Sequence, residues 1–214
     1  MLVQICGAIR EAHLTGIVHR DIKPQNIMVC YRAGIADVIK ILDYGLVKSF
    51  AAHESSNTTE TNVLIGTPKF MAPERLETPW LADPKIDIYS IGTVAYYLLM
   101  GHTPVPGMMP NGMLDTIDSE QSPYRELAGQ KMFQELVGLI GFCVSSEPSL
   151  RPDSVGAIID VLQKIQESYP WQQSSAEAWW MEHENNLLQF TSNIREGKPT
   201  LIPSNQAADH LEKV

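Results

Sequence analysis

Residues 19–26 read His-Arg-Asp-Ile-Lys-Pro-Gln-Asn, and residues 43–45 read Asp-Tyr-Gly. Gly-Thr follows at 66–67 and Ala-Pro-Glu at 72–74. His-Arg-Asp alone would be a weak signal, but a stretch of this length followed in order by the later motifs does not arise by chance. The rest of the chain is therefore best interpreted around this ordered series.

The bulk composition is that of an ordinary globular protein. The chain has 214 residues, of which 44% are hydrophobic and 19% charged, enough for one domain with a sizeable core and a tail. Its formal net charge of −9 argues against a nucleic-acid-binding surface, which would be basic overall. The most apolar stretch, residues 86–100, contains Asp87 and is too short to span a bilayer. With no secretory signal visible, we expect a cytoplasmic protein; the oligomeric state stays open.

Hydrophobic spacing indicates a mainly helical chain. Helices are expected at residues 2–14, 87–100, 132–143 and 154–166. Two short strands, 27–30 and 38–42, are expected to form a hairpin with its turn at 31–37, and residues 17–18 resemble a strand entering the 19–26 loop. The three dispersed cysteines show no metal-ligand spacing and are expected to be free thiols. The predicted class is mainly α with a small two-stranded β-hairpin.

The motif series resembles the catalytic half of a serine/threonine protein kinase, over about residues 1–167. The resemblance implies the C-terminal lobe of the α+β kinase fold. It also implies transfer of the ATP γ-phosphate to Ser or Thr hydroxyls of a protein substrate, with ATP and Mg²⁺ as cofactors. The hairpin between Asn26 and Asp43 is longer than is typical around residues 32–34, which is similar to bacterial members and weakly favours that origin.

The same resemblance implies a role for each motif residue. Asp21 would orient the substrate hydroxyl and accept its proton, and Lys23 would place its ammonium near the γ-phosphate. Asn26 and Asp43 would bind Mg²⁺ through oxygen atoms, which suit a hard cation. Met28 would form the floor under the adenine ring.

The segment from Asp-Tyr-Gly to Ala-Pro-Glu resembles an activation segment. A phosphate on Thr58, Thr59 or Thr61 could pair with Arg20 and order the segment, and a plain polar loop is an equally good interpretation. Thr67 resembles the Thr that hydrogen-bonds the catalytic Asp and Lys.

Other matches are structural. Glu74 and Arg151 resemble a buried ion pair that anchors the segment, and Asp87 resembles the helix Asp that holds the catalytic-loop backbone. The structural and regulatory set is completed by His19, Tyr44 and Gly45. Tyr44 replaces the usual Phe, and its hydroxyl needs a partner if it is buried.

No Gly-x-Gly-x-x-Gly loop and no Val-Ala-Ile-Lys strand precede residue 19 in this chain. The resemblance implies that those parts hold the nucleotide phosphates, so we expect this chain alone to bind ATP weakly and to transfer little phosphate. The alternatives are an inactive kinase-lobe fragment or a pseudokinase-like interaction module. A truncated gene or a start codon placed too late would also explain the pattern. Retention of all four catalytic and metal-binding residues argues against a long-dead scaffold.

The chain is expected to divide at about residue 168. Residues 1–167 form the kinase lobe, and residues 168–214 form a C-terminal extension with a helix near 176–190 and a loose tail. Trp179 and Trp180 lie on that helix. Packing of the helix onto the lobe is favoured over a ligand-stacking platform, and a docking surface is a further alternative.

Overall fold

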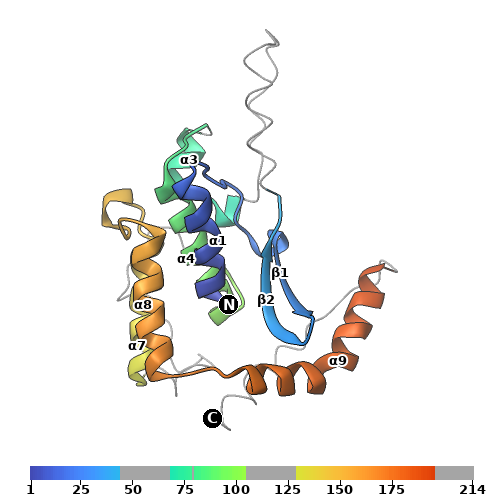
Figure 1. The fold of residues 1–214 in the computed structure, drawn as a ribbon. Helices are drawn as coiled ribbons and strands as arrows, with labels where there is room; N and C mark the ends of the chain where they lie inside the picture. Colours follow the sequence, from blue (N-terminus) through green and yellow to red (C-terminus); the bar gives the residue numbers. More distant parts are fainter. Residues whose placement is uncertain (44–67, 79, 105–128, 196–214) are drawn as a thin grey trace.

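In a computed structural model of the chain, the structure is described for residues 1–43, 68–78, 80–104 and 129–195, with side chains of the last helix up to residue 184. The helices are α1 (Leu2–Leu14), α3 (Pro73–Glu77), α4 (Pro84–Met100), α7 (Lys131–Cys143), α8 (Val155–Ser168) and α9 (Gln173–Arg195). The strands β1 (Ile27–Arg32) and β2 (Ile35–Ile41) form an antiparallel pair. This arrangement confirms the predicted mainly helical class with a small hairpin (Figure 1).

Helix α4 is the centre of the bundle, and its residues from Ile86 to Tyr96 are all buried. The Asp83 side chain caps its start by accepting a hydrogen bond from the Lys85 backbone N–H. It ends at Gly101, whose φ of 73° is a left-handed conformation that glycine adopts without strain. Helices α1 and α7 pack against α4, α8 packs on both of them, and the hairpin lies on the other side of α1 (Figure 1).

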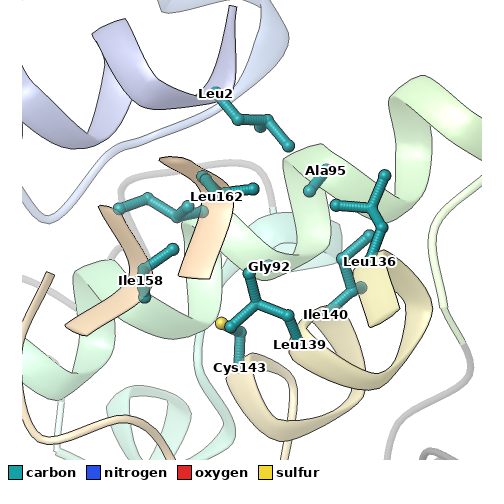
Figure 2. A pocket seen from close by; sticks show the side chains of 10 residues that line it. Leu2, Gly92, Ala95, Leu136, Leu139, Ile140, Cys143, Ile158 and Leu162 are labelled. Atoms are coloured by element: carbon teal, nitrogen blue, oxygen red, sulfur yellow. The ribbon is translucent and has the colours of Figure 1, made fainter. Parts of the chain in front are cut away.

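Helices α4 and α7 approach closely at Gly92. A β-carbon at this position would lie 2.5 Å from the Cβ of Cys143, so only glycine fits without a shift. Beside this contact is a small apolar cavity, lined by α1, α4, α7 and α8 (Figure 2). Its volume of about 10 Å³ is at most that of one water molecule, so it is a packing defect of the core and no binding site.

The hairpin differs from the prediction. Both strands are longer than expected, and the turn is reduced to Ala33 and Gly34, with φ values of 51° and 79°. Left-handed residues at both positions match the twist of antiparallel strands, so this short turn is favoured. The predicted turn at 31–37 was therefore wrong, because the additional residues extend the ladder.

Two further segments depart from expectation. Residues 17–18 are not assigned as a strand, and they pair with neither strand of the described part of the chain. The next two backbone N–H groups, those of His19 and Arg20, bind the Asp87 side chain. The last helix, Gln173–Arg195, is longer than the predicted 176–190. Among the described residues, no helix combines the length and apolarity needed to cross a bilayer.

Candidate active site

The polar loop of residues 19–26 connects α1 to β1 and is held by Asp87 of α4. The Asp87 side chain is fully buried, and each carboxylate oxygen accepts one backbone hydrogen bond at 2.8 Å, from His19 and from Arg20. Arg20 has a φ of 69°, which is costly for a residue with a side chain. The paired hydrogen bonds offset this cost and fix the loop between the core and β1.

His13 is a site residue that the sequence reasoning missed. Its Nε2 lies 2.8 Å from the Asp87 carboxylate, in the last turn of α1. No motif or spacing pattern in the sequence singled out His13. The sequence carried no signal of this contact, because Asp87 lies 74 residues away from His13 and its two oxygens already accept backbone hydrogen bonds.

Three predicted site residues converge within the loop. Lys23 Nζ lies 2.7 Å from the Asp21 carboxylate, and the Asn26 side-chain amide donates to both the backbone oxygen and the carboxylate of Asp21, at 2.8 and 2.9 Å. Both of these bonds use Asn26 Nδ2, so neither occupies the amide oxygen. The Asp21 and Lys23 side chains are 14% and 18% exposed, so the cluster is shielded yet reachable from solvent.

The hairpin places Asp43 next to a residue that is hydrogen-bonded to Asn26. Leu42, one residue before it, donates its backbone N–H to the Asn26 backbone oxygen at 2.8 Å, and its carbonyl lies 3.2 Å from His19 Nε2. Asp43 follows with a φ of 58° and an exposed side chain. The ladder thus starts just after one predicted metal ligand and ends just before the other.

These oxygen donors fit Mg²⁺. Magnesium in phosphoryl-transfer sites takes one or two protein oxygens and completes its shell with phosphate and water, so Asn26 and Asp43 would be sufficient. In the described part of the chain no group of three His, Cys, Asp or Glu side chains could hold a metal. Met28, the predicted adenine floor, lies on β1 and is 47% exposed.

The short helix α3 is tied to both the loop and the core. Arg151 is 2% exposed and donates to both Glu74 oxygens, from Nη1 at 2.6 Å and from Nη2 at 2.8 Å. The neighbouring Arg75, which the sequence analysis did not single out, is buried and donates to the Arg20 backbone oxygen. Burial, reinforced by the positive charge of Arg20, lowers the pKa of the Arg75 guanidinium.

Several predicted residues lie outside the described residues: Tyr44, Gly45, Thr58, Thr59, Thr61 and Thr67. Their roles, and the pairing of Arg20 with a phosphate, stay predictions. The proposed division near residue 168, the loose tail and the cytoplasmic location are likewise predictions.

Comparison with known proteins agrees with the geometry. Residues 1–189 match the protein kinase domain family. Serine/threonine-protein kinase Pkn1 of Myxococcus xanthus is 42% identical over 104 residues, which are 49% of this chain and 15% of that protein. For PknL of Mycobacterium tuberculosis the identity is 41% over 107 residues, 50% of this chain and 25% of that protein.

A third relative covers more of the chain. Serine/threonine-protein kinase A of Synechocystis is 32% identical over 161 residues, which are 75% of this chain and 30% of that protein. The chain therefore spans less than a third of the length of each of these three relatives. The match over most of the chain, together with the loop and hairpin geometry, leads to one conclusion. The chain belongs to the protein kinase domain family, serine/threonine type.

Proposed function

We propose that this chain supplies the catalytic lobe for transfer of the ATP γ-phosphate to Ser or Thr hydroxyls of a protein. The observation that carries the proposal is the convergence of Asp21, Lys23 and Asn26 in one partly shielded cluster beside the end of the hairpin. A purely structural loop has no need to bring a carboxylate, an ammonium and an amide together with a second exposed carboxylate, Asp43, nearby.

Asp21 is the residue that would act on the substrate hydroxyl. The Asn26 amide binds both its backbone oxygen and its carboxylate, so the side chain is held in one orientation. A carboxylate in that position can accept the hydroxyl hydrogen bond and take the proton as the oxygen attacks phosphorus. Lys23, bound to the same carboxylate, can turn its ammonium to a phosphate oxygen when a nucleotide enters.

Asn26 and Asp43 would hold Mg²⁺ at the end of the hairpin. When bound, the metal neutralises charge on the ATP phosphates. The contribution of the chain is to fix the two ligands, through the antiparallel pairing of β1 with β2 and the Leu42–Asn26 hydrogen bond. Exposed Met28 on β1 offers an apolar surface for the adenine ring.

The test supplies the nucleotide-binding parts that do not occur in these 214 residues. A nucleotide-binding lobe from a protein kinase that contains a Gly-rich loop and its Lys is fused before Met1, and ³²P transfer from Mg·ATP to casein is measured. We expect transfer to Ser or Thr, and Asp21→Asn should lower the rate by roughly 10²-fold or more, because a general base contributes that much. The unfused chain, measured alongside, should transfer little.

Asp160→Asn is the matched control, because Asp160 is an exposed carboxylate on α8. This variant should retain the parent rate. The proposal would fail if the fusion binds Mg·ATP but transfers nothing, or if Asp21→Asn keeps the parent rate. The first outcome would favour the non-catalytic interaction lobe, whose partner would cover the apolar side chains exposed on the hairpin.

A further inference from the structure

A β-bulge in the hairpin carries a partly buried carboxylate, that of Asp37, which has no part in the proposed kinase chemistry. Cys30 pairs with Val38 and Arg32 pairs with Ile35, so Tyr31 on β1 faces two residues, Ala36 and Asp37, on β2. Asp37 has a φ of 57°, a left-handed conformation that Asp tolerates better than most residues. Bulges of this kind redirect a side chain away from the ladder.

The redirected Asp37 carboxylate binds two indoles of the C-terminal extension. Trp180 Nε1 donates to Oδ1 at 2.9 Å, and Trp171 Nε1 donates to Oδ2 at 3.0 Å, so each oxygen has its own donor. Tyr31, on the other side of the bulge, contacts the Trp180 ring, with the centroids 6.1 Å apart. Helix α9 thus crosses the turn end of the hairpin (Figure 1).

Helix α1 also binds the bulge, through the side chain of Gln4. Gln4 donates from Nε2 to the Asp37 backbone oxygen at 2.8 Å and accepts from the Ile39 backbone N–H at 3.0 Å. The side chain therefore occupies backbone groups on the open edge of β2. A two-stranded hairpin is at best marginally stable alone and needs a helix packed against it. Here two helices, far apart in sequence, meet at one aspartate.

We propose that Asp37 is a positioning residue for the metal-ligand hairpin. By binding Trp171 and Trp180 it fastens the C-terminal extension to β2, and the fastened strand holds Leu42 against Asn26 and so keeps Asp43 in place. We call the two hydrogen bonds from Trp171 and Trp180 to Asp37 the clamp. The clamp does not depend on the proposed function. Only the placement of Asp43 for metal binding rests on the proposed function, because it takes Asn26 and Asp43 as metal ligands.

The two indoles contribute unequally. Trp171 is 53% exposed, so water competes for its hydrogen bond, whereas Trp180 is partly buried and also contacts Tyr31. A hydrogen bond to a charged acceptor is worth roughly tenfold in an equilibrium constant when it is shielded, and less when exposed. Trp180→Phe should therefore loosen the hairpin more than Trp171→Phe.

The experiment uses the 214-residue chain and amide hydrogen exchange resolved by NMR. Asp37→Asn keeps the shape of the side chain but leaves one indole facing an amide that cannot accept. We expect exchange of the Ile39 and Leu42 amides to rise by roughly tenfold in Asp37→Asn and in Trp180→Phe. The Trp171 and Trp180 indole N–H signals should shift in Asp37→Asn. Amides of α4 should be unchanged, which separates the clamp from a global loss of stability.

A second readout tests positioning directly. Because the chain alone is expected to bind nucleotide weakly, Mn²⁺ is titrated in the presence of ADP into the fusion that carries the nucleotide-binding lobe. The Mn²⁺ affinity should fall severalfold in Asp37→Asn but stay at the parent value in Asp160→Asn. Unchanged exchange of the Leu42 amide in both Asp37→Asn and Trp180→Phe would overturn the clamp. Faster exchange with unchanged Mn²⁺ affinity would overturn the positioning role. Absence of any Mn²⁺ binding by the parent fusion would instead overturn the proposed metal site, and the exchange data would still decide the clamp.

Discussion

Glu74→Gln should destabilise the lobe more than any single surface change. Arg151 is almost fully buried, and Glu74 neutralises it through two short hydrogen bonds. Glutamine keeps one acceptor but places an NH₂ group against the second guanidinium nitrogen. Arg151 keeps its bonds to the backbone oxygens of Ser145 and Lys85, so it stays in place as an uncompensated buried charge.

The magnitude follows from how exposed each partner is. Breaking a fully buried pair by removing one member costs about 3–5 kcal/mol. The Glu74 side chain is 20% exposed, so water replaces part of the lost interaction, and we expect a value at the low end, about 3 kcal/mol. With a urea m-value of about 2 kcal/mol/M, the unfolding midpoint should fall by roughly 1.5 M.

The assay is urea unfolding followed by tryptophan fluorescence, arranged as a double-mutant cycle with Arg151→Met. Removing both charges should restore part of the loss, because the buried charge is then absent. Glu135→Gln is the control: it breaks the exposed Lys131–Glu135 pair of α7 at 3.6 Å and should cost less than about 0.5 kcal/mol. A midpoint shift for Glu74→Gln no larger than that of Glu135→Gln would refute the reasoning.

Three further outcomes are expected. Gly92→Ala should lower the free energy of unfolding by about 1–3 kcal/mol in urea titrations, because its new methyl would meet Cys143. Burial raises the pKa of the Cys6 and Cys143 thiols to about 12, so the folded state keeps both thiols protonated at pH values where the unfolded chain loses the protons. The free energy of unfolding, measured by denaturation at a series of pH values, should therefore fall as pH rises from about 9 to 12. His13→Leu, which leaves the Asp87 carboxylate without one donor, should cost about 1–3 kcal/mol by the same urea titration, and the core variant Leu162→Met should cost less.

Helices of this fold were predictable because the signals were local. The 3.6-residue spacing of apolar side chains located α1, α7 and α8 to within two residues at each end. The start of α4 was missed by three residues because the Asp83 cap and Pro84 were not recognised as a helix start. The hairpin turn was misjudged because a bulge adds strand residues that no alternation pattern reveals.

The candidate residues of the loop could be identified from the sequence, but the residues that they contact in the fold could not. The motif alone singled out Asp21, Lys23 and Asn26 as candidates, since the proposed phosphoryl transfer would use those side chains at that spacing. His13 and Arg75 were overlooked because each acts through a group distant in sequence, Asp87 for the first and the Arg20 backbone oxygen for the second. The hydrogen bonds from Trp171 and Trp180 to Asp37 could not be predicted for the same reason, because 134 and 143 residues separate the partners in sequence.

The backbone of the 19–26 loop and of Asp43 is strained, and contacts with the core and the hairpin keep it in this conformation. Arg20 and Asp43 both adopt left-handed conformations that cost of order 1 kcal/mol or more each for residues with side chains. A neighbouring hydrogen bond holds each backbone conformation in place. For Arg20 it is the bond from its own N–H to the buried Asp87 carboxylate, and for Asp43 it is the bond between Leu42 and Asn26. A substitution that weakens the hydrogen bonds of Asp87 should therefore displace Asp21 before it unfolds the helical bundle. The reason is that the free energy needed to open the strained loop is smaller than that needed to unfold the helices. Displacement of the Asp21 side chain and unfolding of the helical bundle should thus be separable in mild urea.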